Sequence, residues 1–370
     1  MSTPWPMPPA PDRGYLVAAS NARAAQDQLP VEPPVAAPPA AGRFLSVDDR
    51  GVYVREIPAA DGGPVDESLP VTLYVHGLAG SSTNFDSLAT LLAGHTRGFS
   101  LDLPGFGRSD PPPRERYSLL DDAEVLSGLL RQLAPDRPVH LVGNSLGGMV
   151  CTALAARHPE QVATMSLISP AVPDLRLTQD RGADPRLALL LAPGTMPAAV
   201  RRLASVGPLA RAQGMAALCY GDPSVLTDDD LRIAADDLGW RYGLPWVHSS
   251  TVQSLRSLMR SYLRPGPWSF RAAAARVAVP TLVIWGAKDR LVDAKLAVPT
   301  AAAFSDSRLL ILADTGHVSM MEQPTATARA VLALWQDAET AVDVPGADPR
   351  RTGSGAPPGT SATAVAPSSS

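Results

Sequence analysis

The stretch that decides the fold is residues 139–151, which read VHLVGNSLGGMVC. The apolar run 139–142 predicts a strand that stops at a glycine, and residues 146–156 are compatible with a helix. Residues 143–147 between them match G-x-S-x-G, in which a sharp strand-to-helix turn carries a serine. Such a turn strains the serine backbone and crowds the residues two positions before and after it, where glycine fits. The first helical amides would then face the serine hydroxyl and suit a developing negative charge.

The pattern is short, and its meaning depends on the rest of the chain. Three fixed positions among five residues arise often by chance. A strand-turn-helix joint could also need its glycines for packing alone. Context therefore has to decide between a structural turn and a nucleophile.

Composition and charge limit the classes of function. The chain has 370 residues, 32 Lys and Arg, 36 Asp and Glu, and a formal net charge of −4. No basic stripe points to nucleic acid or to anionic lipid. No apolar run reaches the ~18 residues of a membrane span, and the first 30 residues lack a signal-peptide core. We therefore expect a soluble, cytoplasmic protein, with Cys151 and Cys219 as buried free thiols.

The chain divides into a folded part and two tails. Residues 1–42 and 339–370 are rich in Pro, Ala, Gly, Thr and Ser, and we expect them to be disordered. Residues 43–172 and 269–338 alternate predicted strands with predicted helices. This alternation predicts an α/β fold whose mostly parallel sheet carries helices on both faces. A hairpin within residues 44–57 would add antiparallel strands at one edge.

Between the two α/β parts, residues 173–268 break the alternation. The pattern there predicts only helices, over 184–191, 196–209, 227–238 and 248–263.

Several loops follow predicted strands, and active residues of such sheets lie beyond the carboxyl ends of the strands. His76 and Gly77 follow the predicted strand 71–75, Asp289 follows 281–285, and His317 follows 308–312. A serine, an acid and a histidine therefore occur in the order that a nucleophile elbow requires.

At this point the chain resembles the α/β-hydrolase superfamily from about residue 44 to residue 337. The stretches that carry the resemblance are HG at 76–77, DLPGFGRS at 102–109, GNSLGG at 143–148, GAKD at 286–289 and GH at 316–317. The resemblance implies Ser145 as nucleophile, His317 as general base and Asp289 as the acid that orients it. It also implies an oxyanion hole made by the backbone amides of Leu78 and Leu146, with no metal and no organic cofactor.

The acid and the base each have competitors. Asp293 lies four residues after Asp289, and Asp314 lies close to His317, but Asp289 follows its predicted strand most directly. His76 is expected to pack or to hydrogen-bond beneath the oxyanion loop. The remaining histidines, which are expected to be structural or surface groups, are His95, His140, His158 and His248.

The helical stretch 173–268 resembles the cap domain of this superfamily, which would roof the serine and exclude water. Its apolar side chains could line an acyl or alcohol pocket. Alternatively, most of them form the core of the cap itself. The candidates are Trp240, Tyr242, Trp246, Leu255, Leu258 and Met259.

The fold alone does not determine the reaction. A serine nucleophile argues against the haloalkane-dehalogenase and epoxide-hydrolase branches, which use aspartate. Residues 143–148 are similar to those of C–C bond hydrolases of aromatic ring degradation, but those enzymes typically carry tryptophan just after the histidine, where this chain has Val318. We therefore expect a carboxylic ester hydrolase that acts on a small-to-medium apolar substrate. The alternatives are a C–C hydrolase, a cofactor-free haloperoxidase-like perhydrolase, an acyltransferase, or a hydrolase-fold protein that binds a ligand without turnover.

Overall fold

A computed structural model describes residues 15–17, 42–113, 116–174, 194–266 and 269–342. Its strands are β1 (Tyr15–Val17), β2 (Gly42–Val47), β3 (Arg50–Glu56), β4 (Val71–Val75), β5 (Arg97–Leu101), β6 (Val139–Asn144), β7 (Val162–Ile168), β8 (Thr281–Gly286) and β9 (Ser307–Leu312). Its helices are α1 (Asp86–Leu92), α2 (Leu119–Leu133), α3 (Leu146–Arg157), α4 (Met196–Ala204), α5 (Pro208–Cys219), α6 (Asp228–Tyr242), α7 (Val247–Tyr262), α8 (Phe270–Ala274), α9 (Ala297–Ala301), α10 (Ser319–Glu322) and α11 (Pro324–Val342).

The described strands form one nine-stranded sheet in the order β1-β9-β8-β7-β6-β4-β5-β3-β2. From β5 through β4, β6, β7 and β8 to β9, each strand runs parallel to its neighbour. The hairpin β2-β3 pairs antiparallel with β5 at one edge. The predicted α/β class, with its mostly parallel sheet and antiparallel edge hairpin, is therefore confirmed.

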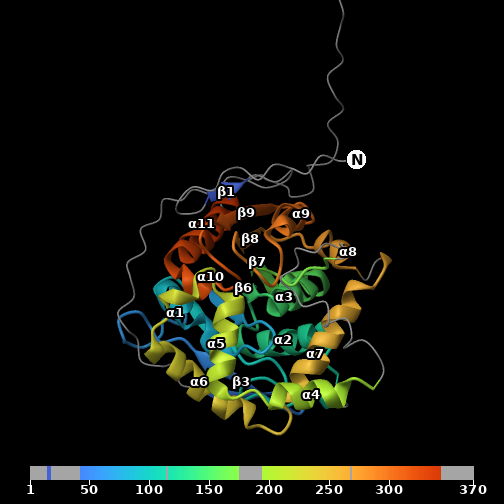
Figure 1. The fold of residues 1–370 in the computed structure, drawn as a ribbon. Coiled ribbons are helices and arrows are strands. Elements are labelled where there is room, and N and C mark those ends of the chain that lie inside the picture. The colour runs from blue at the N-terminus through green and yellow to red at the C-terminus, as the bar shows by residue number, and fades with distance from the viewer. Residues whose placement is uncertain (1–14, 18–41, 114–115, 175–193, 267–268, 343–370) are drawn as a thin grey trace, which may run out of the picture.

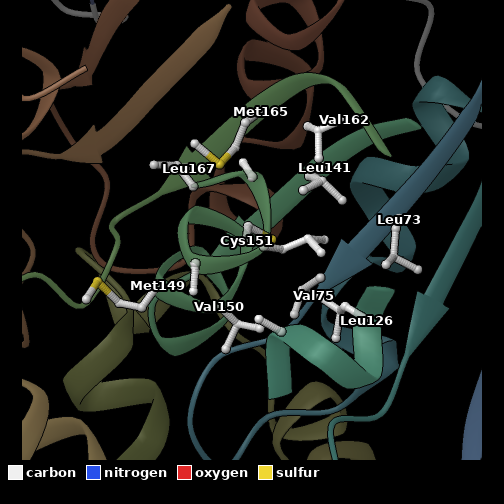
Figure 2. Close-up of a cluster of buried hydrophobic side chains, with 14 of the residues drawn as sticks. Leu73, Val75, Leu126, Leu141, Met149, Val150, Cys151, Val162, Met165 and Leu167 are labelled. Atoms are coloured by element: carbon white, nitrogen blue, oxygen red, sulfur yellow. The ribbon is translucent and has the colours of Figure 1, made fainter. Parts of the chain in front are cut away.

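Alternate residues of the buried strands pack into two separate cores. In β4, Leu73 and Val75 belong to the core under α2 and α3, whereas Tyr74 belongs to the core under α1 and α11. This division follows from the strand period of two, which sends successive side chains to opposite faces. Figure 1 shows α1 and α11 on one side of the sheet and α2 and α3 on the other. Figure 2 shows the first core, in which Val150 and Cys151 of α3 lie among labelled side chains of β4, β6, β7 and α2.

The structure differs from the sequence prediction at the N-terminal segment. Residues 15–17 were expected in a disordered tail, but they form β1 and pair antiparallel with β9, Leu16 opposite Leu310. The tripeptide Tyr-Leu-Val is apolar and β-prone, so it can extend an exposed sheet edge despite the proline-rich surroundings. The other residues of the two predicted tails lie outside the described ranges, apart from Gly42 in β2 and the end of α11.

Four helices, α4 to α7, lie between β7 and α8 in the chain. α5 packs against α6, and α4 packs against α7. The predicted helix over 196–209 is in fact two helices, because Pro208 starts a new one at α5, where its missing N–H costs nothing. The predicted helix over 184–191 lies outside the described residues.

Both cysteines are free and buried, as expected. No helix in the described part of the chain is long and apolar enough to cross a bilayer.

Candidate active site

Ser145 sits at the junction of β6 and α3 in a strained conformation, with φ 53° and ψ −115°. L-residues rarely adopt this region, so the surrounding structure must impose it. A Cβ at Gly143 would lie 2.8 Å from the backbone of Gly147, and one at Gly147 would overlap the backbone of β4 at Val75. The two glycines are therefore required by close backbone packing, as the elbow pattern predicts. The turn leaves Ser145 half-buried at the end of the strand.

The loop after β4 passes directly beside this serine. A Cβ at Gly77 would lie only 3.0 Å from the Cβ of Ser145. The Gly77 carbonyl accepts hydrogen bonds from the His76 ring at Nδ1 (2.7 Å) and from the Gly80 amide (3.1 Å). In a trans peptide the N–H points opposite to the carbonyl, so the Leu78 amide faces away from both of these donors. The Leu78 N–H therefore points to the side of the loop opposite the Gly77 carbonyl.

His76 is fixed in one tautomer by its two neighbours. Its Nε2 accepts from the Leu103 amide at 2.9 Å, so the proton of the neutral ring is on Nδ1, where it can be donated to Gly77. Burial lowers the pKa of His76, which keeps the ring neutral. The hydrogen bond expected of His76 beneath the loop after β4 is therefore present.

His317 and Asp289 form a buried pair. The Nδ1 of His317 lies 2.8 Å from Oδ2 of Asp289, whose side chain is fully buried. The other oxygen, Oδ1, accepts from the amides of Leu291 (2.8 Å) and Val292 (3.0 Å). With Nδ1–H donated to the carboxylate, Nε2 of the imidazole is left free to accept a proton.

The elbow and the histidine loop are joined through Asn144. Its side-chain Nδ2 donates to the backbone carbonyls of His317 (3.1 Å) and Ile168 (3.1 Å). The described residues show no hydrogen bond between the Ser145 hydroxyl and the His317 ring. In enzymes without substrate such contacts are often long and tighten in the complex.

The competing acids have other partners. Asp314 is mostly exposed and pairs with Lys288 at 2.7 Å. Asp293 accepts from the Lys295 amide at 2.9 Å and begins a short helical turn. The structure therefore brings Asp289, rather than either competitor, to the histidine.

The other histidines have structural surroundings. His140 stacks on Trp335 and bonds to Thr164 at 2.8 Å. His158 lies 3.2 Å from a Glu124 oxygen, His248 packs near Tyr242, and His95 is exposed.

The two tryptophans expected to line a pocket lie in different surroundings. Trp240 is 45% exposed, and the Arg108 guanidinium lies 4.3 Å from the centre of its ring. Trp246, just before α7, is half-buried, and its indole Nε1 has no hydrogen-bond partner among the described residues. A role in substrate binding stays a prediction for both.

Sequence reasoning missed two charged side chains that hold these loops. Arg241 of α6 donates to the carbonyls of Gly80 (3.0 Å) and Ala79 (3.3 Å) in the loop after β4. Glu322 of α10 accepts from the amide of Gly316, next to the histidine, at 2.9 Å. Neither residue belongs to a short local pattern, and only the tertiary structure brings them to the site.

Within the described ranges, no group of three or more His, Cys, Asp or Glu side chains could hold a metal ion.

Comparison with known proteins identifies the family of this chain. A sequence model of the alpha/beta hydrolase fold matches residues 70–324. The chain is 28% identical, over 78% of its length and 93% of the relative, to the 2-hydroxy-6-oxononadienedioate/2-hydroxy-6-oxononatrienedioate hydrolase of Cupriavidus pinatubonensis. It is 24% identical, over 71% of its length and 74% of the relative, to a monoacylglycerol lipase of Mus musculus. The solved structure of a membrane phospholipase A, a bacterial virulence factor, superposes with a TM-score of 0.64 at 24% identity, covering 81% of this chain and 87% of that one. The chain therefore belongs to the α/β-hydrolase family.

Proposed function

We propose that this chain is a serine hydrolase that cleaves a carboxylic ester of a small-to-medium apolar substrate through an acyl-enzyme on Ser145. The observation that carries the proposal is the buried contact of 2.8 Å between His317 and Asp289, joined through Asn144 to the strained serine. A nucleophile, a base and an acid that orients the base form the arrangement that activates a serine hydroxyl.

The reaction begins when the Oγ of Ser145 attacks the acyl carbon and Nε2 of His317 takes the hydroxyl proton. Asp289 holds the imidazole in the correct tautomer and stabilises the imidazolium. The backbone amides of Leu78 and Leu146 stabilise the negative charge on the tetrahedral oxygen; one such donor is worth about 2.7–4 kcal/mol in a serine protease.

The intermediate collapses when the C–O bond to the alcohol breaks and His317 returns the proton to the leaving oxygen. A water molecule, deprotonated by the same histidine, then attacks the acyl carbon. The second intermediate releases the acid and restores the Ser145 hydroxyl. Each proton is accounted for by these side chains and water.

We further propose that residues 173–268 form a cap over the serine and govern the choice of substrate. The support is that α4 to α7 form one helical insertion whose ends return to the same sheet domain. Such a lid can sequester the acyl-enzyme from water.

A second candidate is C–C bond hydrolysis, which the Cupriavidus relative favours because the match covers 93% of that protein. One residue disfavours C–C hydrolysis: Val318 follows the histidine, where C–C hydrolases typically carry tryptophan.

A substrate panel separates the two reactions. It would compare p-nitrophenyl esters of increasing chain length with a 2-hydroxy-6-oxo-dienoate. Turnover of the esters at higher kcat/KM than the dienoate supports the proposal, and the reverse order supports the second candidate. A chain that turns over neither compound and does not react with a fluorophosphonate would be a ligand-binding protein instead.

A further inference from the structure

The end of α5 touches both loops that carry the buried pair. The amide of His317 donates to the carbonyl of Cys219 at 2.6 Å. Arg290, directly after Asp289, donates to the carbonyl of Ala217 at 2.7 Å. Both carbonyls belong to the last turn of α5, where helical carbonyls have no partner within the helix. The histidine loop and the acid loop therefore each donate a hydrogen bond to a carbonyl in the last turn of α5.

Glu322 adds a tie between this helix end and the histidine loop. Its Oε1 accepts from the Gly316 amide at 2.9 Å, and its Oε2 accepts from the Gly221 amide at 2.7 Å. The carboxylate thus holds the residue directly before His317 and, at the same time, the residue two positions past the end of α5.

The two backbone segments that Glu322 joins, at Gly221 and at Gly316, are in close contact. A Cβ at Gly221 would lie 2.9 Å from the amide of Gly316 and 2.9 Å from the carbonyl of Asp314. A Cβ at Gly316 would overlap the carbonyl of Cys219. Because backbone meets backbone here, a shift of the α5 end has to displace the histidine loop.

Partial burial disfavours the charged form of the Glu322 carboxylate, and hydrogen bonds from backbone amides compensate for this. Burial raises the pKa of Glu322, and the nearby charge of Asp289 raises it further, whereas the hydrogen bonds from the amides of Gly221 and Gly316 lower it. A carboxyl group in these surroundings is held in place by hydrogen bonds to the charged form.

We propose that Glu322 is a positioning residue, which fixes the His317 loop to the end of α5, so that α5 sets the position of the imidazole. The inference rests on the proposed function, since it assigns to Glu322 a part in placing the general base. It differs from a purely structural role because it predicts a loss of chemistry in folded protein.

The test compares Glu322→Gln with Glu124→Gln in the full chain. A glutamine side chain has one oxygen, so it can accept from Gly221 or Gly316 but turns an NH₂ donor toward the other amide. Glu124 is the matched control, because it also accepts hydrogen bonds, from Arg157 and His158, but on α2 at the surface.

Two readouts are measured. The first is the rate at which a small fluorophosphonate labels Ser145, together with kcat and KM for p-nitrophenyl acetate. The second is amide hydrogen exchange of the peptides that cover 216–221 and 313–318, which does not depend on activity. We expect Glu322→Gln to lower the labelling rate and kcat by about 100-fold at unchanged KM, since small misplacements of catalytic groups cost this much. Exchange should rise in both peptides together and remain at the parental level in β6.

The inference is overturned if folded Glu322→Gln keeps the parental labelling rate, or if exchange rises in only one of the two peptides. If Glu322→Gln does not fold, Glu322→Asp replaces it, because the shorter side chain keeps the charge but cannot span both amides. A parent protein that is not labelled at Ser145 would instead contradict the proposed function, and the exchange readout would still decide whether Glu322 ties the two segments.

Discussion

Asp289 and His317 lie 28 residues apart in the chain and meet in a hydrogen bond of 2.8 Å between Oδ2 and Nδ1. The acid is fixed independently of the histidine, because its other oxygen accepts from the amides of Leu291 and Val292. The carboxylate is therefore in place for the imidazole, which has little freedom to choose another tautomer.

The first prediction is that Asp289→Asn lowers kcat by about 10⁴-fold, as the corresponding change does in a serine protease. The amide oxygen can still accept from Leu291 and Val292, so the NH₂ group faces the histidine. The imidazole must then accept at Nδ1 and carry its proton on Nε2, where it can no longer take the serine proton. Steady-state kinetics with a p-nitrophenyl ester measure the loss.

Asp293→Asn and Asp314→Asn are the controls for this change, because both acids are bonded elsewhere. Both variants should retain most of the parental kcat. If Asp293→Asn loses kcat and Asp289→Asn retains it, Asp289 is not the acid that orients the histidine.

The second prediction concerns the oxyanion loop. His76→Ala removes the ring donor that holds the Gly77 carbonyl, so the neighbouring Leu78 amide loses its fixed direction. We expect kcat to fall by about 10- to 100-fold with little change in KM, less than the full loss of an oxyanion donor. His76→Asn keeps an N–H group near this carbonyl and should recover part of the activity.

His95→Ala, at an exposed histidine in the same half of the sheet domain, should behave as the parent does. Parental kcat in folded His76→Ala would show that the Leu78 amide is oriented by other contacts.

The parts of the site that could be predicted from the sequence are those encoded by short local patterns. The glycines at 143 and 147 are separated from Ser145 by one residue each, and Asp289 and His317 each follow an apolar strand directly. Because parallel strands end at one edge of the sheet, the order of these loops was enough to place the residues together.

The remaining features depend on contacts between distant segments. Glu322 lies five residues beyond His317, but its second partner, Gly221, is 101 residues away. Arg241 of α6 reaches the loop after β4, where its partner Gly80 is 161 residues away. β1 was missed because three apolar residues within a proline-rich segment give no periodicity.

The third prediction is a pH dependence of stability that His140 causes. Burial lowers the pKa of His140 from 6.5 to about 4 in the folded protein. Between these values the unfolded chain binds a proton that the folded protein does not, so stability rises with pH. The contribution is fully present above pH 6.5 and is lost as the pH falls toward 4.

Urea unfolding of the parent and of His140→Asn at pH 7.5 and pH 5 measures the contribution of His140 to the free energy of unfolding. When the pH falls from 7.5 to 5, the free energy of unfolding should decrease by about 2 kcal/mol more in the parent than in the variant. Equal losses would mean that the buried ring is not the group responsible.

The fourth prediction separates the two tryptophans of the proposed cap. If Trp246 faces the acyl pocket, Trp246→Ala should shift the preference among p-nitrophenyl esters toward bulkier chains, because it vacates apolar volume. Trp240→Ala should shift the profile in the same direction but by less, since that ring is 45% exposed and lies against the Arg108 guanidinium. The same profile in parent and both variants would assign substrate choice to other residues.

Ser145 is the proposed nucleophile, and the site of covalent labelling identifies the residue that attacks the substrate. The parent and Ser145→Ala are treated with a fluorophosphonate, digested, and analysed by mass spectrometry, alongside ester hydrolysis and thermal unfolding. We predict one adduct, on the peptide that contains Ser145, and no adduct and no ester hydrolysis in Ser145→Ala, with a Tm close to that of the parent. An adduct on another residue, or full ester hydrolysis by Ser145→Ala, would contradict the claim.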